Sequence, residues 1–281
     1  MLVFLNGEIL DENDAKISIS DLSYQFGYGL FETIKCEQSI PVFFESHFKR
    51  LTHSAKEIGM PFPIEGDEIK SWIVNLLSAS KLTNARVRIT ISKRIGDKFN
   101  VLILALPLGN QSSSYSLLGY TLGRDSRSVS FRHKTTSRAD SYVAFTKAQE
   151  QGFNDAVYVN EKNELIECTR ANIFLVMEDK IITPVLESGI LSGVTRAKLL
   201  DIAKEENFLL EEKIIHSLYL NKAKEVFASN AIIGVMPVSK IKFDDKEYNF
   251  LKSEKTILIK KLYDKKVSEY ILKNRSLSKQ Y

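Results

Sequence analysis

The stretch Glu164–Met177, ELIECTRANIFLVM, joins two apolar runs through a short polar segment. Leu165 and Ile166 are typical of a strand, and a second apolar run begins at Ile173. Glu167 ends the first run, where the chain is expected to turn inward. A partly buried carboxylate is costly unless a cation or an N–H group binds it. Glu167 is therefore either a surface turn residue or the partner of a cationic ligand, such as a protonated pyridine ring.

The segments around this stretch predict a chain of mixed helices and strands. Residues 1–10 have the pattern of a hairpin with an Asn6-Gly7 turn, and two amphipathic helices and two strands follow it. The expected elements are helices at 40–60 and 67–80 (with Asp67 as the cap of the second), strands at 85–92, 99–107 and Val129–Phe131, a helix at 137–153, a meander of three strands at 155–184, a helix opening on Gly193 at 193–207, a strand followed by a loop at 225–238, and helix thereafter.

The run LGNQSSSYS, residues 108–116, is the best candidate for an interdomain linker because Gly, Asn and Ser gather between a buried strand and a new pattern. We therefore expect a small N-terminal domain at 1–109, a linker at 110–118 and a larger C-terminal domain at 119–281.

Composition places the chain among ordinary globular proteins. Its 281 residues are 44% hydrophobic and 26% charged, with a formal net charge of +4. The basic C-terminal residues alternate with Glu and Asp, which favours a solvated helix face over a nucleic-acid-binding tail. Cys36, Cys168 and the four histidines show no metal-ligand spacing. The sequence has no secretory apolar region and no apolar run of about 18 residues, so we expect a soluble cytoplasmic protein.

Lys134 and several short residues extend the chemistry suggested by Glu167. Lys134 follows the expected strand and precedes a helix, so it is either a solvated lysine or one that forms a Schiff base and then carries a proton. Gly193, Val194 and Thr195 stand at a helix start, which is either an ordinary cap or an anion site. A lysine, an acid and a helix-start anion site together suit a phosphorylated pyridine cofactor.

A family resemblance covers nearly the whole chain. The blocks that carry it are FLNGEIL (4–10), FGYGLFETIK (26–35), HFKRL (47–51), HKTTSR (133–138), ECTRANIF (167–174), GVTR (193–196) and SNAIIGVMPV (229–238). In this order they resemble the fold-type IV (class IV) pyridoxal-phosphate enzymes, which include branched-chain and D-amino-acid aminotransferases and aminodeoxychorismate lyase. The resemblance implies an α/β (α+β) homodimer with a small N-terminal α/β domain, a larger C-terminal domain with a mixed sheet or pseudo-barrel, and pyridoxal 5'-phosphate (PLP) as cofactor.

The resemblance also implies roles for single residues. Lys134 matches the lysine that binds the cofactor covalently, and Glu167 matches the partner of its pyridine nitrogen. Asn172 is either a cofactor contact or a residue that bonds the backbone in a tight turn. The residues that match the phosphate-binding positions are Arg50, Gly193, Val194, Thr195, Ser229 and Asn230.

Members of this family differ in substrate, and three features favour a lyase. Thr33 stands where the lyases commonly carry threonine, Arg138 follows Lys134 as in some lyases, and the SNAIIGVMPV segment is similar to the lyase form of its loop. Other positions depart from that pattern. Tyr28 replaces an expected aspartate, and Arg94 is a basic residue that could meet a substrate carboxylate. Lys35 stands where some transaminases use a basic side chain for their substrate.

The resulting expectation is a 4-amino-4-deoxychorismate lyase. An amino-acid transaminase and a non-catalytic member of the fold stay open as alternatives. The presence of both Lys134 and Glu167 argues against the non-catalytic alternative.

Overall fold

The computed structural model describes residues 1–94, 96, 98–110, 112–121, 126–160, 162–243, 245–251 and 253–278. Tertiary contacts divide the chain into two compact units. Unit 1 consists of Met1–Asn110, His133–Ser137 and Lys266–Tyr281, and unit 2 consists of Gln111–Arg132 and Arg138–Lys265. The first boundary lies next to the expected one. The chain differs from the expected domains because two later segments, His133–Ser137 and the residues from Lys266 onward, also belong to unit 1.

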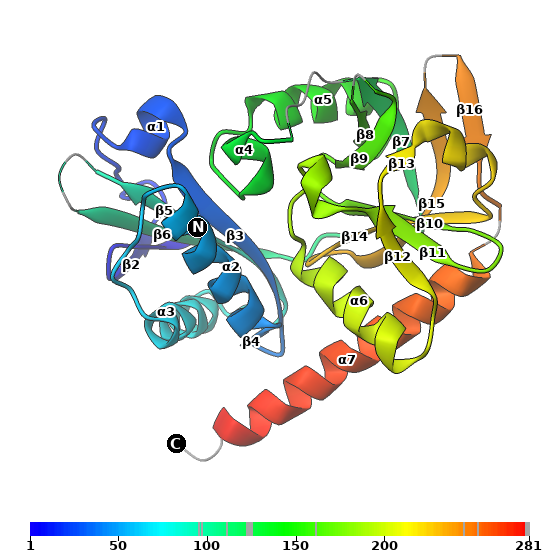
Figure 1. Ribbon diagram of the computed structural model, residues 1–281. Coiled ribbons are helices and arrows are strands. Elements are labelled where there is room, and N and C mark those ends of the chain that lie inside the picture. Colours follow the sequence, from blue (N-terminus) through cyan, green and yellow to red (C-terminus); the bar gives the residue numbers. More distant parts are fainter. Residues whose placement is uncertain are drawn as a thin grey trace. The chain divides into compact units, whose positions relative to one another are not determined.

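Unit 1 is built on a six-stranded sheet in the order β2-β1-β6-β5-β3-β4, in which every pair is antiparallel (Figure 1). The strands are β1 (Leu2–Leu5), β2 (Glu8–Asp11), β3 (Gly29–Glu37), β4 (Ile40–Pro41), β5 (Ala85–Lys93) and β6 (Phe99–Pro107). The hairpin of β1 and β2 confirms the interpretation of the Asn6-Gly7 turn, and both turn residues have positive φ, as a two-residue hairpin turn requires.

The helices of unit 1 are α1 (Leu22–Phe26), α2 (Phe44–Glu57) and α3 (Gly66–Ala79). Leu51 of α2 and Ile73 of α3 share a core with alternate residues of the strands, such as Ile34 and Ile89. Both helices therefore cover the same face of the sheet. The expected cap of α3, Asp67, is wrong, since the helix begins earlier with Glu65 as its cap.

The opposite face of this sheet carries polar and basic side chains. Residues alternate between the two faces of a strand, and Leu30, Ile34 and Cys36 of β3 belong to the helix-covered core. Phe31, Thr33 and Lys35 therefore point to the other face. Arg86, Arg88 and Thr90 of β5 share that face, because Val87 and Ile89 are in the core.

A buried ion-pair cluster fixes α2 to β3. Glu32 is 1% exposed and accepts hydrogen bonds from Arg50 Nε at 2.8 Å and Arg50 Nη2 at 2.7 Å. His47 Nδ1 lies 2.8 Å from the other side of the same carboxylate. Burial raises the pKa of Glu32, but Arg50 and His47 outweigh it and hold that pKa well below its usual range. Burial lowers the pKa of His47, against the hydrogen bond to Glu32.

Unit 2 contains a ten-stranded mixed sheet in the order β12-β11-β10-β14-β15-β7-β8-β9-β13, with β16 paired to β15. The pairs β7–β8, β7–β15 and β11–β12 are parallel. The strands are β7 (Tyr115–Thr121), β8 (Asp155–Val159), β9 (Glu164–Cys168), β10 (Asn172–Val176), β11 (Ile181–Pro184), β12 (Leu210–Lys213), β13 (Ile215–His216), β14 (Glu225–Asn230), β15 (Gly234–Phe243) and β16 (Lys246–Asn249).

This sheet curls around one core. Leu165 of β9 and Ile215 of β13 pack in the same hydrophobic cluster as Ile173 of β10 and Val226 of β14, although these strands lie far apart in the sheet order. The curl gives the pseudo-barrel character that the family resemblance implies. The helices of unit 2 are α4 (Val129–Arg132), α5 (Ala139–Glu150), α6 (Val194–Glu205) and the first part of α7 (Glu254–Ser278), whose residues from Lys266 onward belong to unit 1. Short 3₁₀ turns lie at Leu186–Ser188 and Ser217–Asn221.

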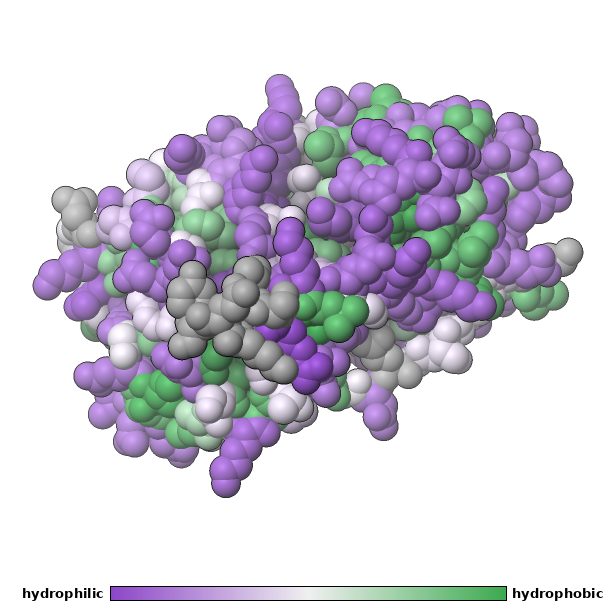
Figure 2. All heavy atoms as spheres, turned by 90° about the horizontal axis from the view of Figure 1, so that it is seen from below, coloured by the Kyte–Doolittle hydropathy of each residue, from purple (hydrophilic) through white to green (hydrophobic). Residues whose placement is uncertain are grey.

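The C-terminal helix α7 has one buried stripe, which includes Ile259, Tyr263 and Val267, while Lys261 and Lys273 are exposed. The prediction of a solvated basic face is thus confirmed. Figure 2 shows hydrophilic side chains over most of the face that it displays, with apolar ones in separate patches. None of the helices in the described part of the chain combines the length and apolar character needed to cross a membrane.

Four expectations about unit 2 are wrong. Val129–Phe131 belongs to the short helix α4, because three alternating residues fit a helical turn as well as a strand. The meander contains four strands, and β9 and β10 pair with other neighbours. β15 and β16 precede the last helix, whereas helix was expected directly after 238. β7 begins at Tyr115, inside the expected linker.

The Glu32 cluster predicts a stability that depends on pH. Glu32→Gln in the apoprotein should lower the free energy of unfolding at pH 7 by about 3 kcal/mol, because it leaves the mostly buried guanidinium of Arg50 without its counter-charge. Since the pKa of Glu32 lies below its ordinary 4.5, its contribution is complete above that pH and is lost as the pH falls further. Urea unfolding from pH 7 to pH 3 should show the two proteins converging in acid.

The matched control is Glu57→Gln, at an exposed position of α2, which should stay within about 0.5 kcal/mol of the wild type. The lowered pKa of His47 adds a loss of stability in the wild type as the pH falls below 6.5. A difference between wild type and Glu32→Gln that is constant over the whole pH range would contradict the assigned role of the ionised carboxylate.

Candidate active site

Lys134 lies in a segment that runs beside the start of β3 in unit 1. The Phe31 N–H donates to the Lys134 carbonyl at 2.9 Å, and the Thr136 N–H donates to the Gly29 carbonyl at 2.8 Å. His133 Nδ1 also lies 3.0 Å from Ser54 Oγ of α2. These bonds hold the lysine backbone on both sides, so its position is set by β3 and α2.

The Lys134 side chain shares an aromatic ring with a second cation. Its Nζ lies 4.6 Å from the centroid of the Phe31 ring, and Arg88 Cζ lies 3.8 Å from the same centroid. The negative face of an aromatic ring attracts both cations. Phe31 therefore holds an amine and a guanidinium close together on the face of the sheet opposite α2.

Thr33 stands next to this pair. It is directly opposite Arg88 in the β3–β5 register, and residues directly opposite in an antiparallel pair have side chains on the same face. Unit 1 thus brings together Lys134, Thr33 and Arg88. Sequence analysis missed Arg88, although the alternation of ARVRITIS would have placed it on the face of β5 away from the core.

Other residues predicted in unit 1 have partners of their own. Arg50 is bound through two of its donors to Glu32, and its contact with a phosphate stays a prediction. Lys35 Nζ forms an ion pair with Glu37 Oε1. The Tyr28 hydroxyl donates to the Ile58 carbonyl at 2.7 Å, which fixes it to the end of α2. Arg94 lies beyond the end of β5, where its backbone forms a bridge with Asp21.

Glu167 is buried in unit 2, which excludes the alternative of a surface turn residue. It is 8% exposed and sits one residue before the end of β9. Its Oε2 accepts a hydrogen bond from the Leu191 N–H at 3.0 Å and a longer one from Asn172 Nδ2 at 3.3 Å. Leu191 lies 24 residues further along the chain, so no local pattern around Glu167 could have predicted this donor.

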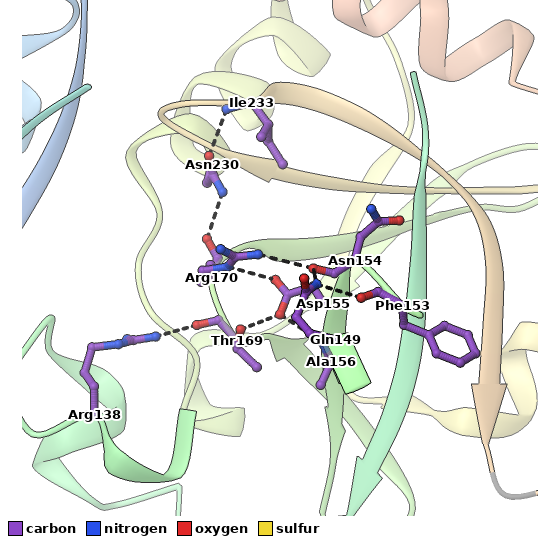
Figure 3. A network of polar contacts seen from close by, with 10 residues as sticks. All are labelled: Arg138, Gln149, Phe153, Asn154, Asp155, Ala156, Thr169, Arg170, Asn230 and Ile233. Carbon is purple, nitrogen blue, oxygen red and sulfur yellow. Dashed lines mark hydrogen bonds and ion pairs between the residues drawn. The ribbon is translucent and has the colours of Figure 1, made fainter. Parts of the chain in front are cut away.

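The turn that follows Glu167 is fixed by a polar network (Figure 3). Thr169 Oγ1 donates to Asp155 Oδ1, and the Thr169 carbonyl accepts from Arg138 Nη2 at 2.5 Å. Arg170 Nε lies 3.7 Å from Asp155 Oδ2, and the Arg170 carbonyl accepts from Asn230 Nδ2 at 2.9 Å. Burial raises the pKa of Asp155, and Arg170 opposes that shift. Arg138, predicted at the substrate, is thus engaged in holding this turn.

The start of α6 has the features of an anion site. Gly193 is its cap and has no side chain to bond the first turn, so the helix dipole and the N–H groups there favour a negative charge. A Cβ at Gly193 would overlap Asn172 Oδ1, so only glycine fits beside that amide. Val194 and Thr195 are buried in the first turn, and Thr195 Oγ1 lies 3.3 Å from the Tyr263 hydroxyl.

Ser229 adds a second feature to the same side of unit 2. Its hydroxyl is buried and has no hydrogen-bond partner among the described residues. Ser229 is directly opposite Asn172 in the β10–β14 register, so both side chains are on one face, and Asn172 reaches Gly193. An orphaned hydroxyl beside an uncapped helix start fits a phosphate group.

Asn230, the next residue, shapes the turn between β14 and β15. Its Oδ1 accepts from the N–H groups of Ile232 and Ile233, both at 2.9 Å. Figure 3 shows the bond to Ile233. Unit 2 therefore brings together Glu167, Asn172, Gly193 and Ser229, whereas the Asn230 amide is engaged by the backbone of neighbouring turns. Their roles at a cofactor stay predictions. Asp155 was missed, and its position at the start of a buried strand shortly after a glycine turn was the available signal. Within the described residues, no group of three or more His, Cys, Asp or Glu side chains is arranged to hold a metal ion.

Comparison with known proteins agrees with this geometry. A sequence 28% identical over 86% of this chain and 88% of its own length is a putative branched-chain-amino-acid aminotransferase of Methanocaldococcus jannaschii. The aminodeoxychorismate lyase of Bacillus subtilis is 26% identical over 96% of both chains. Among solved structures, the PLP-bound form of a hypothetical aminotransferase from Mycobacterium tuberculosis has a TM-score of 0.84, with 18% identity, over 95% of this chain and 99% of that one.

The family defined as "Amino-transferase class IV" matches residues 29–241, which include Lys134, Glu167 and both halves of the predicted anion site. This match spans most of the chain and agrees with the mixed α/β fold of the two units. The chain is an enzyme and belongs to the class IV aminotransferase family.

Proposed function

We propose that this enzyme is a PLP-dependent 4-amino-4-deoxychorismate lyase, which releases pyruvate and forms 4-aminobenzoate for folate biosynthesis. The observation that carries the proposal is Thr33, a hydroxyl on the sheet face that also holds Lys134 and Arg88. The resemblance of position 33 to the lyases, which commonly carry threonine there, and the end-to-end similarity to the Bacillus subtilis lyase support it.

The residues of unit 2 suit the binding of PLP. The N–H groups of Gly193, Val194 and Thr195 and the hydroxyl of Ser229 would bind its phosphate. The family resemblance implies Arg50 as a further phosphate-binding residue. The buried Glu167 carboxylate would accept a hydrogen bond from the protonated ring nitrogen. When bound through Lys134, PLP supplies an electron sink for the substrate carbon that loses a proton.

The side chains of unit 1 suit the proton transfers. Lys134 Nζ takes the proton from C4 of aminodeoxychorismate, and Thr33 Oγ1 relays a proton to the methylene carbon of the departing enolpyruvyl group. That group leaves as pyruvate and the remaining ring becomes aromatic. Arg88, held over Phe31, binds a substrate carboxylate.

Arg94 is a second candidate for a substrate carboxylate. We assign no substrate contact to Lys35, Tyr28 or Arg138, because Glu37, the Ile58 carbonyl and the Thr169 carbonyl engage them. On the family resemblance we also propose a cytoplasmic homodimer.

A branched-chain or D-amino-acid transaminase that uses 2-oxoglutarate is the second candidate. The 28% identity to the Methanocaldococcus protein favours it, and Arg88 would suit a carboxylate of 2-oxoglutarate equally well. In that reaction Lys134 moves a proton from the α-carbon of the amino acid, and Thr33 has no assigned part.

One incubation separates the two candidates. The purified enzyme with PLP and aminodeoxychorismate should produce equal amounts of 4-aminobenzoate and pyruvate. A parallel reaction with L- or D-amino acids and 2-oxoglutarate should show little glutamate formation. Amino transfer without 4-aminobenzoate would overturn the lyase proposal and favour the transaminase.

Lys134→Ala tests the assigned lysine under either activity. It should reduce turnover by at least about 10⁴-fold, because the nucleophile and the proton carrier are both removed. The visible absorption band of the covalently bound cofactor should also be absent. Lys56→Ala, at an exposed position of α2, is the matched control and should retain both the band and the activity. Retained turnover in Lys134→Ala would refute the assignment.

Thr33→Val tests the residue that distinguishes the lyase. The loss of a proton relay should lower kcat for 4-aminobenzoate formation by about 10²-fold, within the usual range for general acid–base catalysis. Thr33→Ser, which keeps the hydroxyl, should recover most of the rate. Any residual amino transfer should be equal in the three proteins. An equal loss of both activities in Thr33→Val would mean that the side chain only supports the fold.

A further inference from the structure

The Asn172 side chain lies between the two parts of unit 2 that are proposed to hold PLP. It is 5% exposed and stands at the first position of β10. Its Nδ2 donates to Glu167 Oε2 at 3.3 Å and to the Leu191 carbonyl at 3.0 Å. A primary amide has two N–H groups, so these two acceptors use both of them.

Leu191 closes this arrangement into a ring of three hydrogen bonds. Its N–H donates to the same Glu167 oxygen that Asn172 contacts, and its carbonyl accepts from Asn172. The orientation of the Asn172 amide follows from these partners. If the amide were flipped, its oxygen would face a carboxylate and a carbonyl, and two acceptors would meet without a proton between them.

The oxygen of the same amide faces the start of α6. Because a Cβ on Gly193 would overlap Asn172 Oδ1, the amide packs directly against the helix cap. One planar group thus touches the carboxylate on one side and the helix start on the other. Leu191 lies two residues before Gly193. Asn172 therefore contacts this short backbone segment at both ends, through a hydrogen bond to the Leu191 carbonyl and through packing against Gly193.

We propose that Asn172 is a positioning residue that acts through Glu167 and Gly193. It fixes the position of the Glu167 carboxylate, which binds the ring nitrogen, relative to the start of α6, which binds the phosphate. The inference rests on the proposed use of PLP. Asn172 was expected either to contact the cofactor or to bond the backbone in a tight turn. In the proposed role it bonds both the Leu191 backbone and the Glu167 carboxylate, and it acts on the cofactor without touching it.

The test compares wild type, Asn172→Ala, Asn172→Asp and Asn160→Ala as apoproteins titrated with PLP. Asn160 is a matched control because it is 9% exposed and its amide also donates to a glutamate, Glu164, at 2.7 Å, in the hairpin between β8 and β9. Two readouts are used: the dissociation constant of PLP, and the ¹⁵N chemical shift of ring-labelled PLP, which reports whether the nitrogen is protonated.

Asn172→Ala should weaken PLP binding by roughly tenfold, the effect of losing one hydrogen bond to a charged group. The ring nitrogen of bound PLP should also lose its proton at a lower pH than in the wild type, because the carboxylate that binds the protonated nitrogen is no longer held in position. Asn172→Asp keeps the shape but replaces the N–H donor with a second carboxylate beside Glu167, so the nitrogen signal should differ further from that of the wild type. Asn160→Ala should match the wild type in both readouts.

Wild-type dissociation constant and nitrogen protonation in Asn172→Ala would overturn the inference while leaving the proposed function intact. If that variant does not fold, Asn172→Asp provides the test instead, and an unchanged nitrogen signal in that protein would contradict the proposal. A wild-type protein that binds no PLP would instead overturn the proposed function, and the inference with it.

Discussion

The burial of the Glu167 carboxylate is the constraint on which the arrangement of unit 2 depends. A charged group that is 8% exposed must have donors in fixed positions, and here they come from Asn172 and from the backbone of Leu191. These hydrogen bonds connect β9 and β10 to the segment that leads into α6. The same contacts bring an uncapped helix start and an orphaned serine hydroxyl to one side of the sheet.

The turn between β9 and β10 shows how this position is maintained. Asp155 is only 1% exposed, and its carboxylate is satisfied by Thr169, the Ala156 N–H and Arg170. Arg138 and Asn230 bind the carbonyls of the same turn. The buried carboxylate of Glu167 is thereby followed by a turn whose polar groups are bonded within the protein, and these bonds limit the movement of the turn.

Unit 1 separates its functions between the two faces of one sheet. The face toward α2 takes Glu32 with Arg50 and His47, which binds the helix to the strand. The opposite face takes Phe31, Thr33 and Arg88, and the segment with Lys134 joins it through hydrogen bonds to β3. Glu32 and Thr33, adjacent residues of one strand, therefore lie on opposite faces, because the strand alternation points them in opposite directions. Glu32 binds α2, and Thr33 is the residue proposed to take part in the chemistry.

The sequence by itself determined the first hairpin from its turn, α2 from its strong periodicity, and α5 and α6 from the glycines beside them. It also determined the ordered motifs that place Lys134, Glu167 and the α6 start in one family. Only the tertiary structure decided the partners: Leu191 for Glu167, Phe31 for Arg88 and Lys134, and Glu32 for Arg50. It also turned Val129–Phe131 into a helix and separated β9 from β10 in the sheet. Periodicity reflects which face of an element is buried, whereas a hydrogen bond between distant segments depends on where the folded chain brings them.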